Sequence, residues 1–178
     1  SMSGTFENIN VPPMLMAFGI TTVDAGQVIS PELKYEGNKL YLIKHTPLDN
    51  YMPNVEQLKA NWKYVNEQIC EENIVSGYAL GFGGIAEAIC KMSFGNGLDA
   101  KINVDENELF NYGYGSILVE SEVELDYPNA ILIGEVTDGE DSILTINGTK
   151  LDIFELMNVN AARFAEVYPD TAEAYNKA

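Results

Sequence analysis

The chain has 178 residues, 46% of them hydrophobic and 10% aromatic, which is the size and composition of one folded domain with a buried core. Its 27 acidic residues outnumber its 10 basic residues, so the formal net charge is −17 and the field repels nucleic-acid phosphates and anionic membranes. No run reaches the roughly 20 apolar residues of a membrane span, and a secretory leader pattern is absent. We therefore expect a cytoplasmic protein that binds neither nucleic acid nor membranes.

Residues 1–3 resemble the scar that tag removal leaves, and we exclude them from function. Cys70 and Cys90 each lie among residues with helical spacing, and neither belongs to a paired framework or a metal-type spacing. We therefore expect both thiols to be buried, in a reducing compartment.

The first part of the chain predicts two strands and a long helix. Val11-Pro12-Pro13 favours an extended backbone before an apolar run, which predicts a strand at about 14–23. The apolar run at 40–43 is typical of a buried strand. Asn54 and Gln57 suit a capping box that opens a helix over 54–71. Its expected apolar face consists of Val55, Leu58, Trp62, Val65 and Ile69.

The middle of the chain predicts a strand, a glycine turn and a second helix. The strand begins at Ile74-Val75, and the turn occupies residues 81–84. In the helix that follows, the residues that share one apolar face are Ile85, Ala88, Ile89 and Met92. Residues 98–104 and 116–119 suit strands on either side of a short helix at 106–110.

The last part predicts two strands, at 130–136 and 143–146, followed by the strong two-residue hairpin signal Asn147-Gly148. Asp152 and Glu155 resemble a capping box that opens a final helix. The apolar face expected for that helix is Ile153, Leu156, Met157, Ala161 and Phe164. Strands mixed with helices predict a sheet covered by helices, of the α/β or α+β class.

Gly81, Gly83 and Gly84 precede a helix, as a turn that faces phosphate requires, because free backbone amides and the helix dipole favour an anion there. They are our candidates for binding phosphate or substrate. The lysine of a P-loop and the full spacing of a dinucleotide fingerprint are missing. Close packing of the strand on the helix is the alternative explanation of these glycines.

Acidic residues gather at 105–108, 120–126 and 138–141, and none of these clusters matches a calcium loop. Carboxylates alternate with apolar residues over 120–126, which favours a solvated strand face, so we assign them no metal and no catalytic role. His45 is the single histidine and has no recognisable partner, so a surface or loop role is expected. We assign no residue to catalysis.

Several segments resemble the single-chain formylglycinamide ribonucleotide amidotransferases, or phosphoribosylformylglycinamidine synthases. Residues 4–13 and the apolar run that follows are similar to the family's TFEDLxVPPTLVSFA stretch. Residues 83–96, GGIAEAICKMSFGN, resemble its GGxAEAISKMxFGN. Leu109-Phe110 before Gly115, and residues 133–136, also lie where the family has them. Together these segments cover nearly the whole chain.

The resemblance implies the C-terminal domain of the second synthase half, a type shared with aminoimidazole ribonucleotide (AIR) synthetase. The fold it implies is a three-layer α-β-α arrangement with partial ferredoxin-like topology. We expect a single domain over 4–168 and a linker over 169–178 toward a missing glutaminase domain. Enzymes of this family are ligases that use ATP and glutamine to convert formylglycinamide ribonucleotide to the amidine in de novo purine synthesis.

The resemblance also implies that ATP and Mg²⁺ are held mainly by domains absent here, with no cofactor expected in this domain alone. The implied partners are the other domains of the same polypeptide, namely an N-terminal-type synthase domain and the glutaminase domain, and a small-molecule nucleotide substrate. A related enzyme of the superfamily, such as a selenophosphate synthetase or a thiamine monophosphate kinase, is disfavoured by the Val-Pro-Pro segment.

The sequence departs from the family at one motif. Many relatives carry HDxSDGG where this chain has Tyr78, Ala79 and Phe82 among the residues before Gly83-Gly84. The polar side chains are lost, whereas the backbone donors of the glycines are kept. We expect the isolated chain to be inactive, because it contains neither a glutaminase constellation nor a plausible set of Mg·ATP ligands. It would either form one wall of a nucleotide or substrate cleft, or serve as an architectural domain that completes a pseudo-symmetric scaffold.

Overall fold

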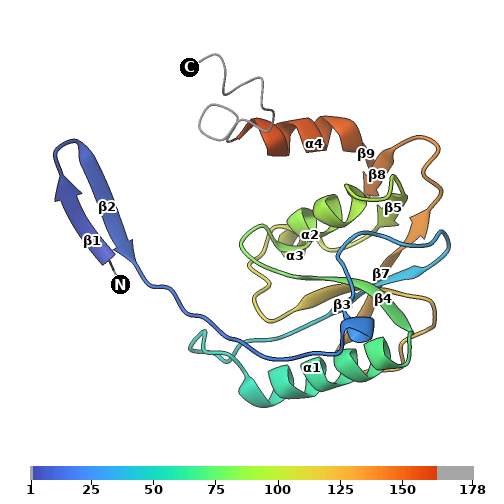
Figure 1. The fold of residues 1–178 in the computed structure, drawn as a ribbon. Coiled ribbons are helices and arrows are strands. Elements are labelled where there is room, and N and C mark those ends of the chain that lie inside the picture. The colour runs from blue at the N-terminus through green and yellow to red at the C-terminus, as the bar shows by residue number, and fades with distance from the viewer. Residues whose placement is uncertain (1, 164–178) are drawn as a thin grey trace.

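The protein forms three layers, with a seven-stranded sheet between helices (Figure 1). The structure is a computed structural model, and it describes residues 2–163. Helix α1 (Val55–Cys70) covers one face of the sheet, and α2 (Gly84–Ser93) covers the other, where α4 (Ile153–Ala162) also lies. The short α3 (Glu106–Leu109) contacts α2. The α-β-α arrangement expected from the resemblance is confirmed.

The sheet has the strand order β4-β6-β3-β7-β5-β8-β9, in which every neighbouring pair is antiparallel except β5 and β8. The strands are β3 (Lys39–Ile43), β4 (Ile74–Ala79), β5 (Asp99–Ile102), β6 (Ile117–Ser121), β7 (Ala130–Thr137), β8 (Ile143–Ile146) and β9 (Thr149–Asp152).

The strands β4-β6-β3-β7 have the order and directions of a ferredoxin-like sheet, with α1 as the crossover from β3 to β4. The second helix differs, because α2 follows β4 in the chain and no helix connects β6 to β7. The topology is therefore ferredoxin-like in part, as the resemblance implied.

Strand β3 shows how the sheet divides the core. Leu40 and Leu42 point to the α2 side and join the larger apolar cluster there. Tyr41 and Ile43 point the other way and pack with Val65 of α1 in a second cluster. This alternation is the period-two pattern of a strand that is buried on both faces.

Helix α2 was predicted correctly from its periodicity. The four residues of its predicted face are all buried, and three of them, Ala88, Ile89 and Met92, have no exposed surface. Burying an isoleucine or methionine side chain stabilises a fold by about 1.5–3 kcal/mol, so Ile85, Ile89 and Met92 make α2 a large contributor to the core.

Helix α1 was predicted correctly in extent but only in part in its buried face, of which Val65 and Ile69 pack as expected. Asn54 caps it as expected, since its side-chain oxygen accepts a hydrogen bond from the Gln57 amide. Val55 and Trp62 are about half exposed, whereas Asn61 is fully buried. The Asn61 amide donates to the Lys44 carbonyl and accepts hydrogen bonds from two side chains, so polar contacts on the sheet side set the orientation of the helix.

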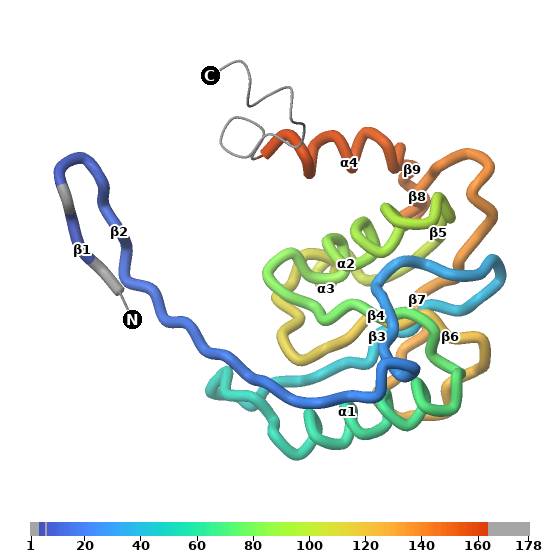
Figure 2. Tube along the Cα trace, in the orientation of Figure 1, coloured from blue at the N-terminus to red at the C-terminus, as the bar shows by residue number. Residues whose placement is uncertain are grey.

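The strand predicted at 14–23 is wrong. Residues 2–14 form a separate hairpin of β1 (Met2–Phe6) and β2 (Ile9–Met14), and residues 15–24 have no regular structure before the 3-10 turn η1 (Ala25–Gln27). Figure 2 shows this segment leaving the body as an extended arm. A strand needs a paired neighbour, and the described part of the chain offers 15–24 none.

The C-terminal elements follow their sequence signals. Asn147 and Gly148 have φ angles of 50° and 82°, the left-handed pair of a type I′ hairpin turn, between β8 and β9. Asp152 caps α4 by accepting from the Glu155 amide at 2.9 Å. Ile153 is buried, and Phe164 and the expected linker at 169–178 lie outside the described residues.

Two expectations about polar residues are wrong. Glu120 is not part of a solvated face, because it is fully buried. Its carboxylate accepts hydrogen bonds from the Lys34 and Tyr35 amides, the Asn38 side chain and the Ser76 hydroxyl, at 2.8 to 3.0 Å. The cysteines are not both in the core, since Cys70 is exposed and Cys90 is half-buried.

Candidate functional site

The glycine turn joins β4 to α2, and the amides of Gly83 and Gly84 already have partners within the chain. The Gly83 amide donates to Oε2 of Glu87 at 3.0 Å, one helical turn further on. The Gly84 amide donates to the Gly81 carbonyl at 3.3 Å. The position that an incoming anion would take beside Gly83 is therefore held by a carboxylate of the protein.

Glu87 is fixed in that position by Lys91, whose ammonium lies 2.9 Å from Oε1. The hydrogen bond from Lys91, together with that from the Gly83 amide, holds the pKa of the Glu87 carboxyl below its usual range, although partial burial opposes the shift. The same pair raises the pKa of Lys91. Glu87 is thus an ionised side chain that closes the turn.

Gly84 lets the start of α2 approach the loop that follows α3. Its φ is +63°, and an added Cβ would lie 2.5 Å from the Asn111 carbonyl oxygen and 2.9 Å from that of Leu109. At Gly83 an added Cβ would lie 2.5 Å from Cβ of Glu87, whereas at Gly81 it would meet nothing within 4 Å. Close packing therefore requires Gly84 and constrains Gly83, but not Gly81.

The residues that replace the family's polar motif have three different environments. Tyr78 is half-buried against the core on the α2 side, with the Lys91 ammonium 6.0 Å from its ring centroid. Ala79 is exposed at the end of β4. Phe82 is exposed, and its ring stacks on Tyr112 at a centroid distance of 4.8 Å.

Beside this turn lies a cavity of about 360 Å³ that sequence reasoning missed. Apolar side chains on its wall come from β3 and from the start of α2, and its rim carries Tyr51 and Tyr112 from two different loops. The residues that line it include Leu42, Leu80, Ile85, Tyr51, Tyr112 and Lys44. The repeated spacing Tyr112-Gly113-Tyr114-Gly115 was the one sequence signal that could have pointed to it.

His45 is buried in the wall of the cavity, so the expected surface role is wrong, whereas the expected loop position is correct because His45 lies in the loop that follows β3. Its Nε2 accepts from the Asn54 amide at 3.0 Å, which leaves Nδ1 as the protonated nitrogen that donates to the Tyr114 carbonyl at 2.9 Å. The His45 amide also donates to the Ser116 hydroxyl. Because both ring nitrogens are hydrogen-bonded, the imidazole has a structural role, which is to connect the backbone at Asn54 to the backbone at Tyr114.

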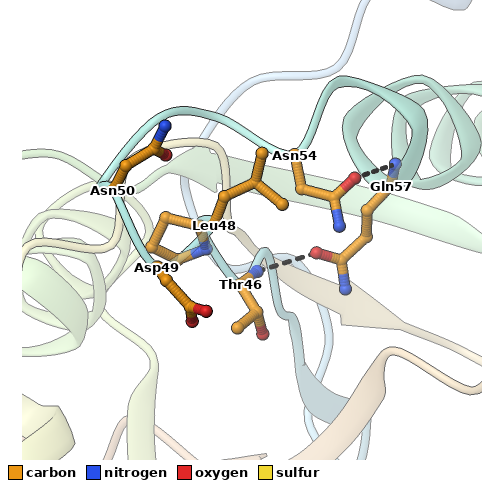
Figure 3. Close-up of a pocket in the computed structure, with 7 residues that line it drawn as sticks. Thr46, Leu48, Asp49, Asn50, Asn54 and Gln57 are labelled. Carbon is orange, nitrogen blue, oxygen red and sulfur yellow. Dashed lines mark hydrogen bonds between the residues drawn. The ribbon is translucent and has the colours of Figure 1, made fainter.

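The loop at 46–52 is tied to α1 by Gln57 and forms a shallow, polar hollow (Figure 3). The Gln57 side-chain oxygen accepts from the Thr46 amide at 2.8 Å, instead of turning back to Asn54 as a full capping box requires. Within residues 2–163 no group of three His, Cys, Asp or Glu side chains is arranged to hold a metal ion, and no helix is long and apolar enough to cross a bilayer.

No protein-family model matches the chain, and no curated protein matches it closely enough to be significant. Solved structures do match. Phosphoribosylformylglycinamidine synthase II from Thermotoga maritima superposes with a TM-score of 0.61 at 12% identity, over 75% of this chain and 28% of the synthase. The T. maritima PurLQS structure gives a TM-score of 0.60 at 12% identity with the same coverage. This chain has the fold of one part of that synthase.

T. maritima PurL is also similar to this chain in its complex with ATP, with a TM-score of 0.60 at 11% identity. Because the chain spans about 28% of the length of these synthase chains, it corresponds to one portion of them. The identities show a shared fold alone. The binding of phosphate or substrate by Gly81, Gly83 and Gly84 therefore stays a prediction. Any such ligand would have to compete with the Glu87 carboxylate for the Gly83 amide.

Proposed function

We propose that this chain is a non-catalytic, architectural domain of a cytoplasmic formylglycinamide ribonucleotide amidotransferase, the ATP- and glutamine-dependent ligase of purine synthesis. Two independent observations support the family. The sequence carries the family-like segments at 4–13 and 83–96, and the fold matches part of the T. maritima synthase. The conversion of the amide to the amidine would then require other domains of the same polypeptide.

The geometry of the glycine turn supports a scaffold role over a chemical one. Its Gly83 amide is bonded to an ionised carboxylate, and a phosphate brought to that point would be repelled by Glu87. The described residues thus do not fit Mg·ATP at this turn, and we place ATP, Mg²⁺ and glutamine hydrolysis in the domains outside this chain.

The observation that carries the architectural role is the apolar arm, which we define as residues 9–28. Every residue of the arm is exposed, and Leu15, Phe18 and Ile20 are 87%, 88% and 98% exposed. A contiguous apolar surface of this kind marks an interaction site. We infer that the arm packs against the neighbouring synthase domain through its exposed apolar side chains, which include Leu15, Phe18 and Ile20.

The test reconstitutes the enzyme in trans. The remainder of the natural polypeptide is expressed without this domain and supplied with formylglycinamide ribonucleotide, ammonia and Mg·ATP. We expect no amidine from either piece alone and measurable amidine when both are mixed. Phe18→Asp together with Ile20→Asp should abolish reconstitution without unfolding the body.

A matched control places the same charges elsewhere. Val159 is also exposed, at 68%, but lies on α4 and outside the arm, so Val159→Asp should leave reconstitution intact. Turnover by the isolated 178-residue chain would contradict the non-catalytic role. Full activity of the remainder alone would contradict the requirement for this domain.

A further inference from the structure

The cavity beside the glycine turn has the construction of a ligand site. Its volume of about 360 Å³ lies within the roughly 300–1,000 Å³ typical of small-molecule pockets. Leu42, Leu80 and Ile85 line it and are at most 6% exposed, so they form an apolar wall. We propose that this cavity binds the planar, uncharged ring of a small heterocyclic ligand, such as a purine base, in contact with Tyr51 and Tyr112, which both line it.

The two tyrosines reach the cavity from separate loops, and both keep ring surface free. Tyr51 is 91% exposed at the tip of a tight turn, with a φ of +60° that is costly for a residue other than glycine. Tyr112 is 59% exposed and is held by its stack on Phe82. Two tyrosine rings that line a cavity with an apolar wall suit a flat ring that packs against them.

The loop that carries Tyr112 is rigid before any ligand arrives. The Leu80 amide donates to the Ser116 carbonyl at 2.9 Å, and the Ser116 amide donates to the Gly113 carbonyl at 2.8 Å. An added Cβ at Gly113 would lie 2.5 Å from Leu80, so the backbone is packed directly on the β4 end. A ring that stacks on Tyr112 therefore loses little free energy to ordering of the loop.

The charges at the cavity favour an uncharged ring over a phosphate. Lys44 is the cation on its wall, and its ammonium lies 3.1 Å from Oε2 of Glu108, which also lines the cavity. The pair is locally neutral, and the whole chain carries −17. An anion would have to compete with Glu108 for Lys44 in a repulsive field, whereas a neutral heterocycle meets no such cost. Binding of such a ligand would be a further function of the domain, because the proposed architectural role does not include a ligand.

The test titrates the 178-residue chain with adenosine, and in parallel with ribose 5-phosphate, while amide NMR shifts are followed. We expect saturable shifts at Gly113 and Tyr114 with adenosine and none with ribose 5-phosphate. Tyr112→Ala and Tyr51→Ala should each weaken adenosine by about tenfold, whereas Tyr112→Phe, which keeps the ring, should bind nearly as the parent chain. Tyr35→Ala is the matched control, because Tyr35 is 57% exposed and does not line the cavity.

Each other outcome overturns the proposal. These are the absence of saturable shifts up to millimolar adenosine, equal binding by Tyr112→Ala and Tyr35→Ala, and ribose 5-phosphate binding at the same amides without adenosine. Loss of binding in Tyr112→Phe would show that the hydroxyl, not the ring, makes the contact. None of these results bears on reconstitution with the remainder of the polypeptide, so the proposed function stands or falls separately.

Discussion

Oε2 of Glu87 lies 3.0 Å from the Gly83 amide nitrogen, so a residue inside helix α2 supplies the anion at the helix's own N-terminal turn. The Glu87 carboxylate therefore occupies the position at which the sequence predicts a bound phosphate. Its strength depends on the charge of Glu87, which Lys91 maintains.

Glu87→Gln should destabilise the protein by about 1 kcal/mol at pH 7, because a neutral amide makes weaker hydrogen bonds to Gly83 and Lys91. The folded-state pKa of Glu87 is lowered, so its contribution to stability is present above the ordinary carboxyl pKa of 4.5 and is lost as pH falls through the lower folded pKa. Urea unfolding at several pH values measures the difference. Glu140→Gln, at an exposed site, is the control, and a pH-independent difference would contradict the ionic origin.

Gly84→Ala should cost at least about 2 kcal/mol, because alanine must adopt a φ of +63° and its Cβ would overlap the Asn111 carbonyl oxygen. Gly81→Ala provides the comparison, since an added Cβ there meets nothing within 4 Å. Urea midpoints of the two variants give the answer. Equal stability would mean that the close approach of α2 to the 109–111 loop is not a packing requirement.

Glu120→Ala should destabilise the protein by about 3–5 kcal/mol, because it leaves two backbone amides and two side-chain donors without their buried acceptor. Glu122→Ala removes a carboxylate two residues away that is exposed, and it should change stability by no more than about 0.5 kcal/mol. Thermal and urea unfolding of both variants distinguish them. A small effect at Glu120 would show that water readily replaces its carboxylate.

Local signals in the sequence predicted the elements that depend on neighbours along the chain. The periodicity of Ile85, Ala88, Ile89 and Met92 identified the buried face of α2, and Asn147-Gly148 identified its hairpin. Both follow from rules that operate over a few residues, the helical repeat and the left-handed turn. The remaining features depend on contacts between residues that are far apart in the chain, which local sequence patterns do not contain.

Glu120 shows why part of the prediction was wrong. Its alternation with apolar neighbours is the pattern of a half-exposed strand, but β6 lies inside the sheet, and the chain at 34–38 closes over it. The acceptor's partners are more than 40 residues away in the chain, so no local pattern contains them. The cavity was missed for the same reason, since Tyr51 and Tyr112 lie on loops that only the folded sheet brings together.

Asp138→Asn should lower the pKa of Asp99 and stabilise the protein at neutral pH. Asp99 is 5% exposed, and its burial raises the pKa of its carboxyl above the ordinary value of 3.8, with additional repulsion from Asp138 and Asp141. Hydrogen bonds from the backbone at Ile143 and Asp141 oppose this shift. A raised folded-state pKa means that the charged form costs stability above that pKa, and that the cost disappears as pH falls below 3.8, where the carboxyl is protonated in both states. The gain from Asp138→Asn should therefore be present at pH 7 and vanish under acid conditions.

Asp49→Asn is the control, because it removes one charge at another exposed site, so the general effect of reducing a net charge of −17 cancels in the comparison. Carboxyl NMR titration of Asp99, with urea unfolding of both variants between neutral and acid pH, makes the measurement. If the two variants are stabilised equally at pH 7, the effect belongs to the overall charge, and Asp138 does not act on Asp99.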